Sequence, residues 1–208
     1  MYHSLRGVRI STLFIFLFTL AACSLDQLKP EAEHKSTYVL NVVSEQHAES
    51  RRNNLLLLVS TPQAQPGFDN RRIAYTKTPF ALDYYTKSEW ADTPAQMFGP
   101  LIVRALDNNG TFRAVVAAPA PVAGDLRLDT EIVRLQQEFL EKPSRVRVTL
   151  RAKLYNVNTH EVLATKQLET VAMAPSEDAY GGVQAANSAA TSLLNELVVF
   201  VQANTPKH

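Results

Sequence analysis

The 208-residue sequence is poor in the residues on which many catalytic and structural sites depend. It contains a single cysteine, Cys23, so no disulfide can form within the chain. Its seven glycines form neither a phosphate-binding loop nor a nucleophile elbow, and its five histidines do not occur in a metal-binding spacing such as HExxH. We therefore expect no metal, no cofactor and no enzymatic activity. Carboxylates such as Glu131, Glu138 and Glu141 leave acid catalysis as an alternative.

The chain also lacks an excess of charge of either sign. Its formal charge is +1, and removal of residues 1–22, which contain Arg6 and Arg9 but no acidic residue, would change it to −1. A balance near zero gives no basic footprint for nucleic acid. The remaining length is within the range of one globular domain.

Residues 1–22 have the organisation of a secretory signal peptide. Arg6 and Arg9 precede an apolar run from Leu13 to Phe18, and small residues follow it. A spanning helix needs about 20 consecutive apolar residues, and this run is too short. We therefore predict that the segment is removed.

The cysteine stands at the predicted cleavage point. Leu20-Ala21-Ala22-Cys23 resembles the bacterial lipobox, in which the cysteine thiol receives a diacylglyceryl group and becomes the first residue of the mature protein. The alternative is an ordinary signal peptide followed by an incidental cysteine. Lipidation is favoured because the pattern lies at the correct distance behind a complete signal, and several acyl chains on Cys23 would anchor the protein without a span. An aspartate directly after the cysteine would favour retention in the inner membrane. This chain has Ser24 there, so we predict that the protein lies at the periplasmic face of the outer membrane rather than at the inner membrane.

Residues 23–36 are predicted to be a lipidated N-terminus and flexible tether, and residues 37–204 a single α+β domain. The apolar run at 55–60 is short and indicates a strand buried on both faces. Strands are expected at 37–43, 55–60, 71–77, 80–85, 111–116, 125–139, 145–154 and 161–172.

Two helices are expected to cover this sheet. Thr93, Pro94 and Gln96 have the order of a capping box with proline in the first turn, and Asn108-Asn109-Gly110 supplies a stop. Pro100 lies inside this helix, where it predicts a kink or two shorter pieces. The second helix ends the chain, with Gly181-Gly182 near its entry and one apolar face formed by Val183, Ala186, Ala190, Leu193, Leu194, Leu197 and Val201.

A long hairpin is the clearest β signal. Apolar residues from Val146 to Leu154 alternate with Arg145, Arg147, Thr149, Arg151 and Lys153. The preceding run changes phase after Ile132, as at a β-bulge. Acids on one strand are expected to pair with bases on the other. Lipid headgroups are the less favoured partners for this basic face. The fold prediction is therefore a mostly antiparallel or mixed sheet packed against two main helices.

Tyr84, Tyr85 and the only tryptophan, Trp90, form the densest aromatic segment. Core packing at the entry to the helix is the favoured interpretation for Trp90. The alternative is that the three side chains form a contact patch for a partner.

Nearly the whole predicted mature chain resembles the ABC-type transport auxiliary lipoproteins, the YmbA-like family. The closing helix, AANSAATSLLNELVVFV, is similar in character to the last helix of that family. The more specific matches are Pro66-Gly67-Phe68-Asp69, Arg72-Ile73-Ala74-Tyr75, Tyr84-Tyr85, Trp90-Ala91-Asp92 and Pro94-Ala95-Gln96-Met97.

The resemblance implies a non-catalytic accessory lipoprotein on the periplasmic side of a membrane. Its partner would be the MCE-domain protein of an ABC transport system that moves phospholipids or other hydrophobic molecules across the envelope. The alternatives are a lipoprotein cofactor of peptidoglycan synthesis or outer-membrane assembly, a lipid-anchored enzyme, and direct lipid carriage by this chain. The sequence leaves a homo-oligomer open.

Overall fold

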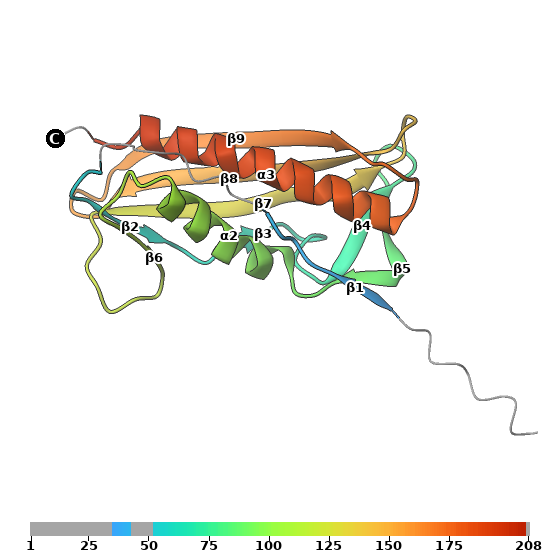
Figure 1. The fold of residues 1–208 in the computed structure, drawn as a ribbon, viewed down its shortest axis with the longest axis horizontal. Coiled ribbons are helices and arrows are strands. Elements are labelled where there is room, and N and C mark those ends of the chain that lie inside the picture. Colours follow the sequence, from blue (N-terminus) through green and yellow to red (C-terminus); the bar gives the residue numbers. More distant parts are fainter. Residues whose placement is uncertain (1–34, 43–51, 207–208) are drawn as a thin grey trace, which may run out of the picture. The chain divides into compact units, whose positions relative to one another are not determined.

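The computed structural model describes residues 35–42 and 52–206. The predicted signal peptide, Cys23 and Val43 lie outside the described residues. The described part contains nine strands in one mixed sheet and two helices (Figure 1). In chain order the elements are β1 (Ser36–Tyr38), β2 (Leu56–Val59), β3 (Gln63–Ala64), β4 (Arg72–Thr76), β5 (Asp83–Trp90), α2 (Pro94–Asn108), β6 (Ala114–Ala117), β7 (Leu126–Glu138), β8 (Arg145–Asn156), β9 (Val162–Met173) and α3 (Ala179–Ala203).

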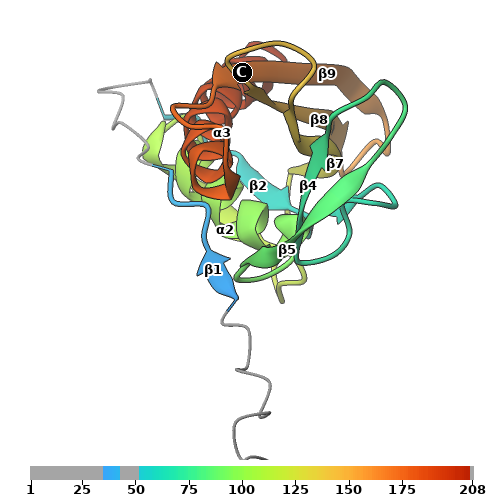
Figure 2. The same ribbon diagram turned by 90° about the vertical axis from the view of Figure 1, so that its right-hand side faces the viewer.

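The sheet curls around a core that α2 and α3 close from the other side (Figure 2). This arrangement confirms the predicted α+β fold. Helix α3 packs on β8 and β9, whereas α2 packs near β2, β3 and β6. None of the helices in the described ranges is long and apolar enough to cross a bilayer.

Strand β7 pairs along both of its edges. One edge forms an antiparallel ladder with β8 from Leu126 to Glu138. Along the other edge β2, β3 and β4 follow one another, each parallel to β7. The chain from 56 to 76 is therefore one interrupted strand, and its interruptions contain Pro62 and Pro66, which have no amide hydrogen to donate to a ladder.

The predicted β7–β8 hairpin is confirmed. Its register shifts between Ile132 and Arg134, where the sequence predicts the bulge. The alternating apolar side chains of β8 are all buried on the inner face: Val146, Val148, Leu150, Ala152 and Leu154.

Helix α2 begins and ends where its signals predict. Thr93 is the N-cap, and its hydroxyl accepts a bond from the Gln96 amide at 3.4 Å. The helix is continuous through Pro100, so the prediction of two shorter pieces is wrong. Pro100 has no amide hydrogen to donate, and it lies on an exposed side of the helix. Phe98 and Ile102, two residues before and after it, are fully buried.

Strand β1 is shorter than predicted. Only Ser36 to Tyr38 pair with β5, and they do so in parallel. Beyond them the chain leaves the sheet, since the Asn41 amide donates to Asn187 Oδ1 on α3 at 2.6 Å. Strand β5, by contrast, continues to Trp90, five residues beyond the predicted end of that strand.

The two glycines of α3 lie in its first turn, and Asp178 is the N-cap. The Asp178 carboxylate accepts a bond from the Gly181 amide at 2.7 Å. Gly182 allows close approach to Gln137, whose side chain is 1% exposed, accepts from Tyr85 Oη at 2.9 Å and donates to Ser144 Oγ at 2.9 Å. A methyl group at Gly182 would overlap Gln137 Oε1.

We expect Gly182→Ala to lower the free energy of unfolding by about 1–3 kcal/mol, because the added methyl group must displace a buried, hydrogen-bonded amide. Gln184→Ala, at an exposed position of the same helix, should change it by less than about 0.5 kcal/mol. Urea unfolding of the two variants measures the difference. Equal stability of both would contradict the close approach.

Candidate partner-binding surfaces

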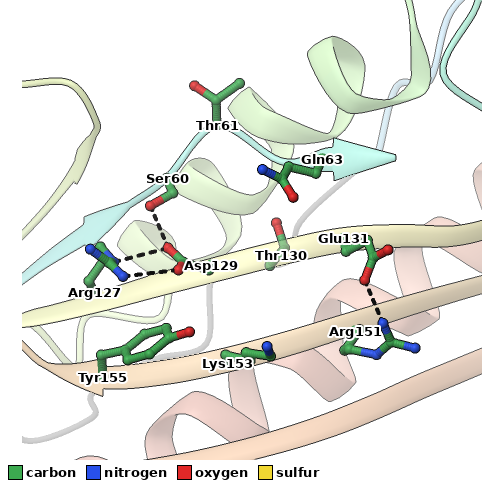
Figure 3. Close-up of a pocket in the computed structure, with 10 residues that line it drawn as sticks. All are labelled: Ser60, Thr61, Gln63, Arg127, Asp129, Thr130, Glu131, Arg151, Lys153 and Tyr155. Atoms are coloured by element: carbon green, nitrogen blue, oxygen red, sulfur yellow. Dashed lines mark hydrogen bonds and ion pairs between the residues drawn. The ribbon is translucent and has the colours of Figure 1, made fainter. Parts of the chain in front are cut away.

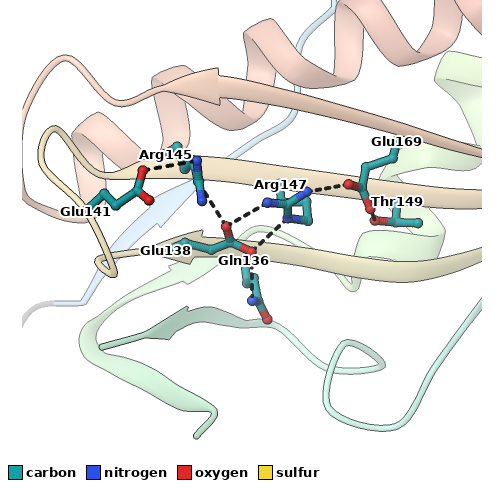
Figure 4. A network of polar contacts seen from close by, with 7 residues as sticks. All are labelled: Gln136, Glu138, Glu141, Arg145, Arg147, Thr149 and Glu169. Atoms are coloured by element: carbon teal, nitrogen blue, oxygen red, sulfur yellow. Dashed lines mark hydrogen bonds and ion pairs between the residues drawn. The ribbon is translucent and has the colours of Figure 1, made fainter. Parts of the chain in front are cut away.

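The outer face of the β7–β8–β9 sheet is charged, and Arg147 stands at its centre (Figure 4). The Arg147 guanidinium donates to Glu138 from Nε at 2.9 Å and from Nη2 at 3.1 Å, and it also pairs with Glu169. Arg145 Nε adds a bond to Glu138 at 3.2 Å. These contacts confirm the predicted pairing of acids with bases.

The Glu138 side chain is only 6% exposed, so its charge depends on these partners. Burial by itself would raise the pKa of Glu138, but the hydrogen bonds and positive charge of Arg147, together with the bond from Arg145, lower it below the ordinary value. The hydrogen bonds that Arg147 donates to Glu138 raise the pKa of Arg147. Both shifts favour the charged forms of Glu138 and Arg147 at neutral pH.

A polar cleft of about 380 Å³ lies further along this face (Figure 3). Arg127 pairs with Asp129 at 3.1 Å, and Ser60 Oγ donates to the same carboxylate at 2.6 Å. Arg151 pairs with Glu131 at 2.6 Å. The lining residues are Ser60, Thr61, Gln63, Arg127, Asp129, Thr130, Glu131, Arg151, Lys153 and Tyr155.

The charged side chains of the cleft bond mainly to one another. Both carboxylates already accept charge-assisted bonds, and the Arg127 guanidinium lies 4.7 Å from the centre of the Tyr155 ring. Within the described ranges no three His, Cys, Asp or Glu side chains gather in an arrangement that could hold a metal ion.

Thr130 lies on β7 where its neighbour changes from β2 to β3. It is 5% exposed, and in the part of the chain that the structure describes its hydroxyl has no hydrogen-bond partner. Figure 3 shows this hydroxyl pointing toward the connection between Thr61 and Gln63. A buried hydroxyl without a partner costs about 1–3 kcal/mol of stability.

A second groove, of about 530 Å³, runs beside α2 and is mostly apolar. Ala95, Gly99 and Val103 line it at every fourth position of the helix, and Pro62 lies opposite. A Cβ atom at Gly99 would be 3.3 Å from Pro62 Cδ, which shows how closely the helix approaches this connection. The groove was not predicted from the sequence, although the repeat of small residues beside the buried face of α2 is a signal for it.

The three aromatic residues of the predicted contact patch lie in different environments. Trp90 is 2% exposed and belongs to the core, so core packing is the interpretation that holds for it. Tyr85 is half-buried and donates to Gln137, and burial raises its pKa above the ordinary value. Tyr84 is also partly exposed: its hydroxyl donates to the Gly67 carbonyl at 3.0 Å, and the Arg72 guanidinium lies 3.8 Å from its ring centre.

Residues 38–198 match the family described as the ABC-type transport auxiliary lipoprotein component. The chain belongs to this family. Membership indicates a non-catalytic role beside an ABC transport system and association with a membrane.

Solved structures share the fold of this auxiliary lipoprotein. Protein XCC0632 from Xanthomonas campestris has a TM-score of 0.74 and 24% identity, with 81% of this chain and 96% of that chain covered. An uncharacterized protein has a TM-score of 0.64 and 13% identity over 81% and 99% of the two chains. The hypothetical protein CT253 from Chlamydia trachomatis has a TM-score of 0.50 and 9% identity over 73% and 98%. A comparison with curated proteins finds no match.

We expect Glu138→Gln to lower the free energy of unfolding at neutral pH by about 1.5–3 kcal/mol, because two arginines lose a buried charged acceptor. Since the pKa of Glu138 is lowered in the folded state, its contribution is present above the ordinary value of 4.5 and disappears as the pH falls through the folded-state pKa. Urea unfolding between neutral pH and about pH 3 should therefore show a weaker pH dependence for this variant than for the wild type.

The matched control is Glu141→Gln, because the Glu141 side chain is 73% exposed and pairs with Arg145 alone. This variant should keep the pH dependence of the wild type and lose at most about 1 kcal/mol. Equal effects of the two substitutions would show that the network contributes no more than a surface ion pair.

Thr130→Val should raise the free energy of unfolding by about 1 kcal/mol, because it removes a buried hydroxyl without a partner and keeps the shape of the side chain. Thr149→Val is the control, since the equally buried Thr149 hydroxyl donates to Glu169 at 2.9 Å and its removal should destabilise the protein. Thermal and urea unfolding compare the two. A loss of stability in Thr130→Val would show that water or a bound molecule satisfies this hydroxyl.

Proposed function

We propose that this auxiliary lipoprotein is a non-catalytic accessory subunit of an MCE-type ABC transport system that moves phospholipids or other hydrophobic molecules across the envelope. Lipid on Cys23 anchors it to the periplasmic face of the outer membrane, and its folded domain binds the MCE-domain protein. The observation that carries this proposal is the family match over residues 38–198.

The N-terminal sequence supports the proposed anchor. A complete signal precedes the lipobox Leu20-Ala21-Ala22-Cys23, and a polar segment separates the cysteine from the folded domain. Ser24 after the cysteine supports the outer membrane. The energy for transport comes from an ATPase elsewhere in the system, since this sequence contains no phosphate-binding loop.

The surface of the domain supports a binding role. Charged side chains that bond one another cover the outer face of the sheet, and an apolar groove runs beside α2. For the contact with the MCE-domain protein we propose Tyr84 and the exposed part of Tyr85, which lie on β5 outside the core cluster that encloses Trp90.

The test is crosslinking followed by purification from membranes, with the native protein and Cys23→Ala compared by mass spectrometry. We expect the native protein to capture an MCE-domain protein, and we expect Cys23→Ala to leave the membrane fraction and to capture at least about tenfold less of it, because anchoring concentrates the two partners.

Ser24→Asp is the matched control, because it keeps the cysteine and changes only the sorting signal. It should remain in membranes but move from the outer to the inner membrane fraction. Capture of cell-wall synthases or outer-membrane assembly factors in place of an MCE-domain protein would refute the transport assignment and support the cofactor alternative.

A further inference from the structure

Three connections meet at one end of the described fold: the β4–β5 turn (77–82), the β7–β8 turn (139–144) and the β9–α3 loop (174–178). We call this region the turn end. Backbone and side-chain bonds join the three connections to one another. The Phe139 amide donates to the Thr76 carbonyl at 2.8 Å, Ala174 to the Ser144 carbonyl at 2.8 Å, and Ser144 to Glu177 Oε1 at 2.8 Å. Figure 2 views the fold from this end.

Large apolar side chains are exposed on the turn end. Phe80 at the tip of the β4–β5 turn is fully exposed, Met173 is 62% exposed and Tyr180 is 55% exposed. Leu82 and Leu140 are exposed as well, so half of the ten exposed large apolar side chains in the described ranges lie in the turn end or within two residues of it. Such a gathering of exposed apolar side chains marks a surface that contacts something other than water.

Phe80 is also conformationally unusual. Its φ of 67° lies in the left-handed region, which a bulky residue rarely adopts and which costs about 1–2 kcal/mol. The turn therefore holds an aromatic ring away from the core in a strained backbone conformation. Strain of this kind is retained at positions that carry a function.

The described chain begins at Lys35, whose ammonium pairs with Glu89 of β5 at 3.6 Å. Strand β1 is parallel to β5. Followed backward from Tyr38, the chain therefore runs in the direction that leads along β5 from Trp90 to Asp83 and the β4–β5 turn. The Tyr38 ring lies 6.1 Å from that of Tyr180. Eleven residues separate Cys23 from Lys35 in the sequence, a length that spans at most about 40 Å.

We propose that the turn end is the membrane-facing surface of this lipoprotein, with the Phe80 ring inserted among lipid acyl chains and Lys77 and Lys142 at the phosphate groups. This inference rests on the proposed lipid anchor at Cys23. A flat lipid surface suits an aromatic tip beside long cationic side chains, since rings lie at the boundary of the acyl chains while ammonium groups reach the headgroups.

The charges at the turn end are compatible with this contact. Lys77 stands three residues before Phe80 in the turn, and its ammonium lies 5.2 Å from the centre of the Tyr75 ring. Among the acidic groups, Glu141 pairs with Arg145, Glu177 accepts from the Ser144 amide and Asp178 accepts from the Gly181 amide. Asp83 follows the turn and is the acid nearest to Phe80 in the sequence.

The contact would orient the molecule. The β7–β8 ladder runs away from the turn end over 12 paired residues, which span about 40 Å. Arg127 and Tyr155 of the polar cleft lie near its far end. The polar cleft would then face away from the membrane, whereas Tyr84 and Tyr85, which directly follow the β4–β5 turn, would stay near the membrane-facing end.

The test uses the full-length lipidated protein in vesicles of phosphatidylethanolamine and phosphatidylglycerol. Trp90 is the only tryptophan and is 2% exposed, so an indole introduced by Phe80→Trp reports on the tip. Doxyl-labelled lipid should reduce the added emission of Phe80→Trp roughly twofold or more, because the quencher lies in the acyl region. Val199→Trp is the control. Val199 is 64% exposed in the last turns of α3, about 30 Å along the helix from Ala179, and its added emission should not change.

Each other outcome overturns the proposal in a distinguishable way. Flotation of all variants with the vesicles, without quenching at position 80, would refute the membrane contact and leave the anchor intact. A blue shift at position 80 that rises with protein concentration, without quenching, would show that a second copy covers the turn end. Failure of every variant to float would refute the anchor itself.

Discussion

The backbone pairing of β7 along both edges is the constraint on which the remainder of the fold depends. A central strand with partners along both edges leaves few unpaired amide and carbonyl groups, and such groups are costly when buried. Strand β8 satisfies one edge with a single long ladder, whereas the other edge is shared by β2, β3 and β4 in turn. The partners of the second edge come from an earlier part of the chain, so these ladders form only when distant segments meet.

The pairing of β7 determines which side chains the helices cover. The strand brings Gln137 under the first turn of α3, where it bonds Tyr85 from β5 and Ser144 before β8. Gly182 is required at this position because any side chain would occupy the volume of the Gln137 amide. Three elements that are distant in sequence are thus held together by one buried polar group, and each polar atom in it has a specific partner.

The two faces of the same sheet serve different purposes. The inner face is apolar and packs against the helices, while the outer face consists of charges that neutralise one another, as Glu138 does with Arg145 and Arg147. Such a face is well solvated and offers directional hydrogen bonds to a partner rather than reactive groups. The exposed apolar side chains gather instead at the turn end, where Phe80 protrudes.

The sequence by itself determined the local features: the hairpin with its bulge after Ile132, the cap at Thr93 and the apolar face of the last helix all follow from periodicity and capping within a few neighbouring residues. It also carried the family resemblance. Only the tertiary structure decided that Trp90 is in the core, that the segment from 56 to 76 forms one interrupted edge of β7, and that Phe80 is fully exposed at the tip of its turn. These outcomes depend on contacts between residues distant in the sequence, and periodicity describes only which side of an element is buried, not which other element covers it.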